Sequence, residues 1–468
     1  MDAKEFFKIA AVLLLYGLCV PALGLLLRWR PNWQRPVFAL VCFMTLGGIL
    51  NAAEWGITLD FFLYRGHAKG YHFYFVEIPA LALLTARVLE DWRKFRFCPP
   101  GLWLYFLYCA LSFVSIINAP FPEYVLMAAF KYLKVALFFV LAYNFLRNEK
   151  DLHFFLQVMC VVMFWEMAVV LKMKYLDGMY QVRGTFEHQN SLSMYVTMIG
   201  LVFLAVSLGP RHPWSNLYFI GYVACAVIQQ ATLSRAGLVI YAAGTLAVSL
   251  LGLIERVTRR RLLVLAALGC VGVIGLTMTL DTILLRFRDP GTQSSAKTRE
   301  LLNIASRQML ADYSLGIGWN NFGRAINKPF PYGKVIDQWE RAGGARVDED
   351  APKGIAESLY WLLLAETGFQ GLLGFILFVF IFLWKNVRAI VVFRCTFLGS
   401  ISLGILLGFT CNYLQSFLER VLTQPRNAML WMMLLGIVAR IDTLRRYRKW
   451  QQSIAREPKR AEDFAHIE

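Results

Sequence analysis

Residues 190–208 read NSLSMYVTMIGLVFLAVSL, and this largely apolar, uncharged run decides the class of fold. At a rise of 1.5 Å per residue, a helix of this length matches the ~30 Å hydrocarbon thickness of a bilayer. Apolar runs of roughly 18 to 25 residues recur along the whole chain. They predict an all-α polytopic membrane protein with about 12 to 13 transmembrane helices.

The composition supports this interpretation, because 58% of the residues are apolar and only 17% are charged. The expected spans cover residues 6–27, 37–55, 71–89, 101–118, 123–146, 152–172, 190–208, 214–231, 236–254, 262–280, 358–384, 395–413 and 426–441. The chain is therefore divided into helices 1–10 (1–280), one large external loop of short helices (281–357), helices 11–13 (358–441) and a basic tail (442–468).

The net charge of +17 comes from short basic clusters between apolar runs, so it indicates membrane orientation and not nucleic-acid binding. One set of connectors is rich in Lys and Arg, including 28–35, 87–96, 147–150, 256–261 and 385–394. The alternate short connectors, the long 281–357 segment excluded, hold only Arg65, Lys69, Lys174, Arg183, Arg235 and Arg420. This asymmetry predicts a cytoplasmic C-terminus and an external 281–357 loop. With thirteen spans the N-terminus lies outside. One span more or fewer near residues 30–70 would place the N-terminus on the cytoplasmic side instead.

Metal and disulfide chemistry are not expected. None of the nine cysteines forms a CxxC pair, and no two of the six histidines have metal-ligand spacing on a helix. The acidic run Asp348-Glu349-Asp350 has no second carboxylate cluster at a fixed spacing, so it is interpreted as a solvated loop. No cofactor is predicted.

Two external connectors carry an arginine that is followed by a glycine within two residues. In QVRGTFEHQN (181–190), Arg183 precedes Gly184, and His188 and Asn190 open the next helix. In TLSRAG (232–237), Arg235 occupies a very short turn. Each arginine is either an interfacial residue that snorkels to the membrane surface or a bidentate donor for a pyrophosphate at the external leaflet.

The long loop carries further candidates. A helix over 296–312 would place Arg299 and Arg307 about two turns apart, near one face. The following GIGWNNF (316–322) offers Trp319 and Asn321, which are typical of carbohydrate contacts and are also common in ordinary loops.

At the exit of the loop, Glu357 and Ser358 precede a span that contains Gly368-x-x-Gly371, a spacing that allows close helix packing. Glu357 is either a general base for an acceptor hydroxyl or a carboxylate favoured by a helix N-terminus.

Two lysines lie inside an expected span. Lys131 and Lys134 share one helical face, and Glu166 in the neighbouring span falls at a similar depth by residue count. Because intramembrane charges are costly, we expect either a buried Lys–Glu pair or a basic lining of a cavity for a lipid phosphate.

Taken together, RGTFEHQN, TLSRAG, GIGWNNF and the GxxG of the loop exit resemble the bacterial O-antigen ligase and O-antigen polymerase superfamily over about residues 120–440. The ligases carry a histidine, then Asn, Ser or Gln, and then GxxG at the spacing found here between Ser358 and Gly368. In this chain Glu357 stands where the histidine is expected.

The resemblance implies a bacterial inner-membrane glycosyltransferase with its active site facing the periplasm. Such an enzyme transfers a glycan from undecaprenyl pyrophosphate to an acceptor sugar hydroxyl, without a metal and with inversion. By this resemblance Arg183, Arg235 and Arg299 stabilise the leaving pyrophosphate, and Glu357 takes the role of the histidine. The remaining candidates for substrate binding are Arg307, His188, Asn190, Lys131, Lys134, Trp319 and Asn321.

The acceptor would be a lipid-core sugar of lipopolysaccharide for a ligase, or another lipid-linked repeat for a polymerase of O-antigen or exopolysaccharide. The glutamate at the histidine position slightly favours the polymerase. The alternative functions are a flippase or other transporter of lipid-linked oligosaccharides, and a catalytically silent scaffold of a polysaccharide assembly complex. The sequence has no internal inverted repeat of the kind that many transporters show.

Overall fold

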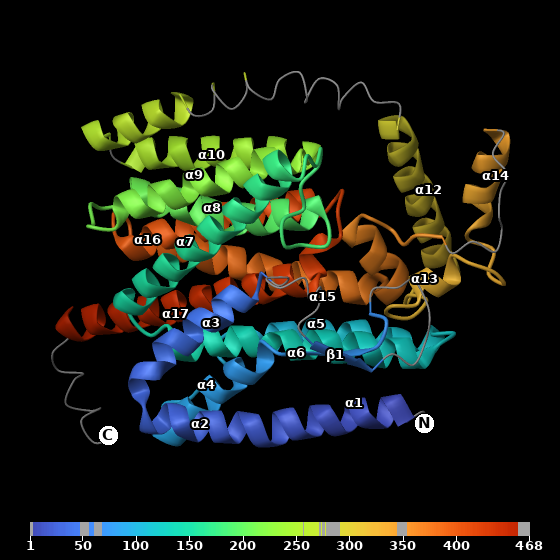
Figure 1. Cartoon of the computed structure of the whole chain (residues 1–468), viewed down its shortest axis with the longest axis horizontal. Helices are drawn as coiled ribbons and strands as arrows, with labels where there is room; N and C mark the ends of the chain where they lie inside the picture. The colour runs from blue at the N-terminus through green and yellow to red at the C-terminus, as the bar shows by residue number, and fades with distance from the viewer. Residues whose placement is uncertain are drawn as a thin grey trace.

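The structure, a computed structural model, describes residues 3–46, 56–59, 68–255, 257–270, 291–343 and 353–456, together with 273 and 277. About 78% of the chain is helical, and eight of the described helices are long and apolar enough to cross a membrane. Most of the long helices lie side by side with roughly parallel axes (Figure 1). The prediction of an all-α multi-pass membrane protein is confirmed.

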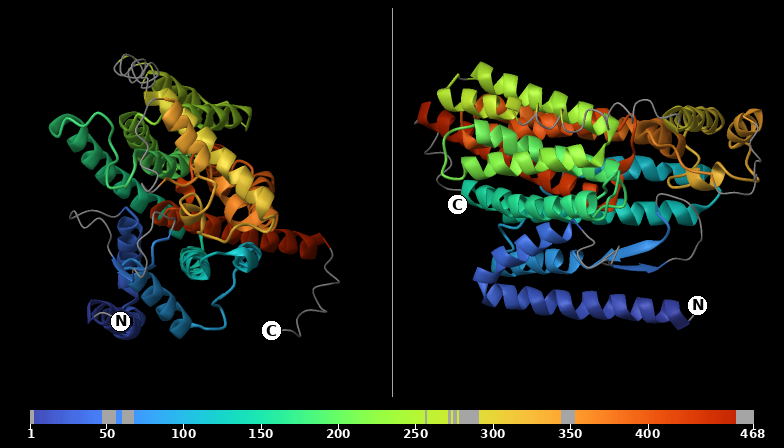
Figure 2. Two further views of the ribbon diagram at one scale, coloured as in Figure 1. Left: turned by 90° about the vertical axis from the view of Figure 1, so that its right-hand side faces the viewer. Right: turned by 45° about the horizontal axis from the view of Figure 1, so that its top comes forward.

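The N-terminal part forms a layer along one side of the bundle (Figure 2). Its helical elements are α1 (Ala3–Leu14), the π-helical turn η1 (Leu15–Cys19), α2 (Val20–Trp29), the 3-10 turn η2 (Pro31–Trp33), α3 (Gln34–Met44) and α4 (Glu77–Glu90). The stretch Phe6–Trp29 is a single candidate span, as expected. Within the described residues α3 has only 11 residues and α4 only 14, so each is shorter than the ~30 Å thickness of the hydrocarbon core.

The expected span at 71–89 is wrong at its beginning. Residues Tyr71–Tyr74 form strand β2, which pairs antiparallel with β1 (Gly56–Leu59), and α4 begins only at Glu77. The aromatic residues of YHFYF raise hydropathy, but they also favour an extended strand. A prediction from hydropathy alone therefore assigned the strand residues 71–74 to a helix.

The central helices follow the expected spans closely. They are α5 (Leu102–Phe113) with the 3-10 turn η3 (Val114–Asn118), α6 (Pro122–Phe145), α7 (Glu149–Leu171) with the π-helical turn η4 (Lys172–Leu176), α8 (Gln189–Leu208), α9 (Ser215–Thr232) and α10 (Arg235–Glu255). Residues 259–270 are also helical.

Helix α8 is the centre of the bundle, because every residue from Asn190 to Leu208 is buried. Its neighbour α16 (Phe397–Gln415) approaches it through small residues. A Cβ at Gly408 would lie 3.0 Å from the carbonyl oxygen of Met198, and a Cβ at Gly404 would collide with the backbone of Val202. Glycines at these positions let the two backbones pack closely, as in other membrane helix pairs.

The remaining elements form the C-terminal third. They are α12 (Gly291–Asp312), α13 (Phe322–Ala325), α14 (Lys334–Ala342), α15 (Leu359–Val392), α16, the 3-10 turn η5 (Val421–Thr423) and α17 (Pro425–Arg456). The expected loop helix at 296–312 is confirmed and begins five residues earlier. Helices α12 and α14 lie at one end of the bundle (Figure 1, Figure 2).

Several predictions lie outside the described residues. These are the second half of the span at 37–55, Arg65, Arg256, most of the span beyond residue 270, the loop residues 281–290, the acidic run Asp348-Glu349-Asp350 and the tail beyond residue 456.

The glycines of GIGWNNF attach the loop to the membrane bundle. Gly316 has a φ of +87°, and a Cβ there would collide with the backbone of Glu366 in α15. The amide of Ile317 donates to the carbonyl of Ala365 at 2.9 Å. Gly368 also has a positive φ and kinks α15 at this contact. The GxxG sequence therefore allows close packing as predicted, but the segment that packs against Gly368 is the loop after α12 and not another membrane helix.

Candidate functional site

A cavity of about 550 Å³ lies at the end of the bundle that carries α12. Five of the predicted site residues line it: His188, Asn190, Arg235, Arg299 and Glu357. They come from the start of α8, the start of α10, α12 and the segment before α15. The apolar residues Val239, Ile240 and Leu418 complete part of the wall. Four segments that are distant in sequence therefore meet at one polar site.

The beginnings of α8 and α10 both lie at this cavity. His188 caps α8, and its Nδ1 accepts a hydrogen bond of 3.2 Å from the amide of Asn190. Ser234 precedes α10, and its Oγ accepts from the amide of Gly237 at 3.4 Å. Helix N-termini carry partial positive charge, so both ends favour an anion in the cavity.

Arg299 links two carboxylates in the cavity. Its Nε is paired with Oε2 of Glu357, and its Nη2 lies 2.9 Å from Oε1 of Glu419. Asn190 donates to the same Oε1 of Glu419 at 2.6 Å. A guanidinium has five N–H donors, so Arg299 can hold both carboxylates and still bind an anion.

The protonation of these groups reflects burial and mutual contact. Burial raises the pKa of Glu419 to about 7, the charge of Arg299 opposes this shift, and the charge of Glu357 adds to it. Burial by itself would lower the pKa of Arg299, but its hydrogen bond to Glu357 and the two carboxylate charges raise it. Burial lowers the pKa of His188, which leaves that ring neutral near pH 7. The cavity therefore holds a permanent cation beside a carboxyl group that titrates near neutrality.

Arg183 and Arg307 do not line the cavity. Arg183 is exposed in the turn before α8, where its carbonyl accepts from the amide of Phe186. Arg307 is exposed on α12, and its guanidinium lies 4.7 Å from the ring centre of Trp361. The expectation that Arg183 shares a cavity with Arg235 and Arg299 is wrong, because the turn at 183–188 places only its last residue there.

Trp319 and Asn321 are buried in the structure, contrary to the prediction of sugar contact. The indole of Trp319 packs on the ring of Tyr132 with 4.5 Å between the centres. Asn321 accepts from the amide of Phe121 at 3.1 Å and donates to its carbonyl at 3.2 Å. The aromatic and amide side chains of GIGWNNF thus fasten the loop to the bundle and do not face a ligand.

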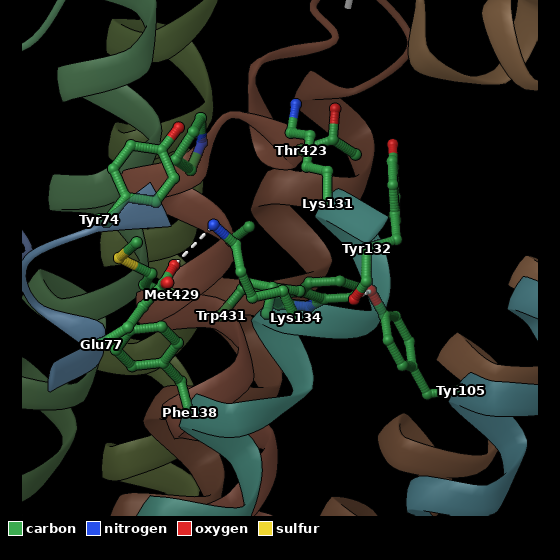
Figure 3. A pocket seen from close by; sticks show the side chains of 13 residues that line it. Tyr74, Glu77, Tyr105, Lys131, Tyr132, Lys134, Phe138, Thr423, Met429 and Trp431 are labelled. Carbon is green, nitrogen blue, oxygen red and sulfur yellow. Dashed lines mark hydrogen bonds and ion pairs between the residues drawn. The ribbon is translucent and has the colours of Figure 1, made fainter. Parts of the chain in front are cut away.

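Lys131 and Lys134 line a separate cavity between α6, α4 and α17 (Figure 3). Lys134 forms an ion pair of 2.7 Å with Glu77, shown by the dashed line. The cavity volume is about 30 Å³, which suits one or two water molecules and is too small for a phosphate group or a sugar. The prediction of a buried Lys–Glu pair is therefore correct for Lys134. The alternative prediction, that the lysines line a cavity for a lipid phosphate, is wrong.

The prediction that Glu166 is the carboxylate of this buried pair is wrong, because Glu77 pairs with Lys134. Glu166 instead accepts from the amide and the hydroxyl of Thr185, each at 2.9 Å. It therefore holds the turn that contains Arg183. Two residues at the same depth in neighbouring spans can still lie on helix faces that do not meet, so residue counting could not identify the partner. Glu77 is an acidic residue inside an apolar run, and this feature of the sequence could have indicated that it pairs with a buried lysine.

Glu419 is the main site residue that the sequence analysis missed. It lies four residues after the end of α16, beyond the turn at 416–418, and it is only 7% exposed. Arg420 is the next residue in the chain, and the sequence analysis uses its charge only to orient the protein in the membrane. Burial lowers the pKa of Arg420, against the opposing charges of Glu366, Glu357 and Glu419. The sequence feature that could have identified both residues is the pair Glu419-Arg420 at the end of a span on the sparsely basic face.

Among the residues that the structure describes, no three His, Cys, Asp or Glu side chains gather into a possible metal site. No protein-family model matches the chain, and a comparison with curated proteins gives no match. The fold and the site geometry therefore define the class at a coarse level. This is a multi-pass helical membrane protein, and among its described residues a polar cavity containing arginine and glutamate side chains lies at one end of the bundle.

Proposed function

We propose that this protein is a membrane glycosyltransferase that moves a glycan from undecaprenyl pyrophosphate to an acceptor sugar hydroxyl. The reaction is inverting and metal-independent, as the resemblance to the O-antigen ligase and polymerase superfamily implies. The proposal is carried by one observation: Arg235, Arg299 and Glu357, predicted from three separate motifs, line the same cavity.

The chemistry of the cavity supports this function. The leaving pyrophosphate gains charge as the glycosidic bond breaks, and fixed guanidinium groups stabilise such charge without having to reorganise. Arg235 and Arg299 provide these groups, and the N-termini of α8 and α10 add partial positive charge. A carboxylate in the same cavity can accept the proton of the acceptor hydroxyl. The apolar residues Val239 and Ile240 suit the first isoprene units of the lipid.

We further propose that the protein lies in the bacterial inner membrane with the cavity facing the periplasm and the C-terminus in the cytoplasm. Helix α8 runs from the cavity at His188 to the opposite end of the bundle. At that end Arg260 and Arg261 donate to the carbonyls of Ser207 and Leu208. The dense basic clusters at this end agree with a cytoplasmic side.

The acceptor follows from the same proposal. A growing lipid-linked repeat, as used by a polymerase of O-antigen or exopolysaccharide, is favoured slightly over a lipid-core sugar, because Glu357 replaces the histidine of the ligases. The flippase and scaffold alternatives predict no covalent transfer, so one assay separates all of these functions.

The test is transfer of a labelled glycan from undecaprenyl pyrophosphate by purified protein in liposomes that contain a chelator. We expect transfer by the wild type and a loss of about 10²–10³-fold for Arg299→Gln, because the charge that stabilises the leaving group is removed. Lys297→Gln is the matched control, since Lys297 lies on the same helix and pairs with exposed Glu300.

Equal activity of Arg299→Gln and the wild type would contradict the proposed site. Movement of the labelled lipid across the bilayer without any new glycosidic bond would favour the flippase instead. The length of the product distinguishes a polymerase from a ligase.

A further inference from the structure

The two carboxylates held by Arg299 differ in their surroundings. The exposed fractions of the side chains are 39% for Glu357, 30% for Arg299 and 9% for Glu419. Glu357 therefore stands at the rim of the cavity, and Glu419 lies in its buried wall. The burial of Glu419 makes its carboxylate the more basic of the two in the cavity.

We propose that Glu419 is the catalytic residue that takes the proton from the acceptor hydroxyl, and that Glu357 is a positioning residue that holds Arg299. This inference rests on the proposed function and assigns a role within it. It replaces the expectation that Glu357, at the histidine position of the ligases, is itself the base.

The orientation of Glu419 is fixed by two neighbours on different helices. Arg299 of α12 and Asn190 of α8 both donate to Oε1, at 2.9 and 2.6 Å. Because Oε1 receives both hydrogen bonds, a proton is accepted more favourably on Oε2. A base held in this way is already oriented before the acceptor arrives, which is what general-base catalysis requires.

The charges around Glu419 come from every element at the site. Arg299 lies on α12, Glu357 before α15, Arg420 next in the chain, and Arg235 and His188 in the same cavity wall. Burial and the charge of Glu357 raise the pKa of Glu419, whereas Arg299, Asn190 and Arg420 lower it, with a result of about 7. A carboxylate with this pKa is partly ionised at neutral pH and is more basic than an exposed one.

The chemical step balances with these groups alone. The acceptor oxygen forms a bond to the anomeric carbon, and its proton passes to the carboxylate of Glu419. The bond between the anomeric carbon and the pyrophosphate oxygen breaks, and its electron pair stays on the pyrophosphate beside Arg235 and Arg299. Glu419 then releases the proton to water, and the products are the extended glycan and the lipid pyrophosphate.

The test compares pH profiles of kcat/KM for the wild type, Glu357→Gln and Glu419→Gln in the liposome assay. We expect a rate for the wild type that rises through about pH 7, because Glu419 must lose its proton. Glu419→Gln should lose about 10²–10⁴-fold in kcat together with this rising limb.

Glu357→Gln gives the distinguishing result. Removing its negative charge lowers the pKa of Glu419, so the rising limb should move to lower pH while transfer continues. KM for the donor should increase, because Arg299 is held less firmly. The inference is overturned if Glu357→Gln abolishes the limb, or if Glu419→Gln retains the wild-type profile.

Two controls separate the possible failures. Glu300→Gln alters an exposed carboxylate on α12 beside Arg299 and should match the wild type. Binding of the fluorescent lipid-linked donor, measured on the same samples, shows whether each variant is folded and competent to bind. Absence of transfer by the wild type would overturn the proposed function and this inference together, whereas wild-type transfer by Glu419→Gln would overturn only this inference.

Discussion

Arg183 and Arg235 differ in how the fold presents them. Arg235 is the first residue of α10 and lines the cavity between two helix N-termini. Arg183 occupies an exposed turn whose conformation is set by Glu166 and Thr185. The two arginines look equivalent in sequence, since a glycine follows each within two residues, but only Arg235 is placed to contact a ligand in this cavity.

Under the proposed function, we therefore expect Arg235→Ala to reduce transfer by about 10²-fold or more, because it removes a fixed charge that would stabilise the leaving pyrophosphate. Arg183→Ala should reduce transfer less than tenfold. Both values come from kcat/KM in the same liposome preparation. A larger loss for Arg183→Ala would restore the role that its motif predicted and would require the turn to move toward the cavity.

The sequence predicted His188, Asn190, Arg235, Arg299 and Glu357 as site residues, and all five line the same cavity. Four of them stand beside a span on the sparsely basic face, and Arg299 lies on the expected helix of the long loop. The sequence could not show whether Trp319 and Asn321 contact a ligand, because tryptophan and asparagine occur both in sugar-binding sites and in the packing of loops. Burial decides between these functions, and burial depends on contacts with distant residues such as Tyr132 and Phe121.

At the scale of elements, the position of α12 depends on the turn that follows it. The helix ends at Asp312, and Gly316 and Gly318 bring the chain against α15 through backbone hydrogen bonds to Ala365 and Glu366. Because Arg299 is part of α12, this turn also determines where its guanidinium lies.

Replacement of Gly316 by alanine should lower the free energy of unfolding by roughly 2 kcal/mol, because the residue has a positive φ and the new Cβ meets the backbone of Glu366. Thermal unfolding in detergent, followed by tryptophan fluorescence, measures the change. Gly354→Ala is the control in the same loop, since nothing lies within 4 Å of its added Cβ. Equal melting temperatures for the two variants would contradict the role of this contact.

Element types were predicted well wherever an apolar run was about as long as the bilayer is thick or longer, as for α6, α8, α15 and α16. The errors occur in the N-terminal layer, where α3 and α4 are short and β2 precedes α4. Hydropathy measures the preference of residues for lipid and does not record backbone hydrogen bonding, so it cannot separate a strand packed on the bundle from a helical turn.

At the scale of the whole molecule, the N-terminal layer is joined to the bundle by a buried charge pair. Glu77 of α4 accepts from the hydroxyl of Tyr16 at 2.6 Å and pairs with Lys134 of α6 at 2.7 Å. The ammonium of Lys134 also lies 4.5 Å from the ring centre of Tyr74 (Figure 3). Three regions of the chain therefore depend on the same pair of charges.

Glu77→Gln should lower the free energy of unfolding by about 3–5 kcal/mol, since it leaves Lys134 buried without its counter-ion. The double variant Glu77→Gln/Lys134→Met should recover most of this loss and retain transfer, because neither residue lines the cavity of about 550 Å³. Detergent unfolding and the liposome assay give the two values. Asp177→Asn, in the exposed pair with Lys172, is the control and should change stability by less than about 1 kcal/mol. Loss of transfer in a stable double variant would show that Lys134 acts on substrate.

The size of the polar cavity has a consequence for the product. A volume of about 550 Å³ accommodates a ligand of ordinary small-molecule size, so under the proposed function only the sugars next to the reacting bond would fit inside. The rest of a long glycan must extend into solvent, beyond the reach of Arg235 and Glu419. Under the proposed function, a chain of three repeats and a chain of thirty present the same terminus to the cavity. The distribution of polymer lengths must then be set by a separate component or by the rate of chain release.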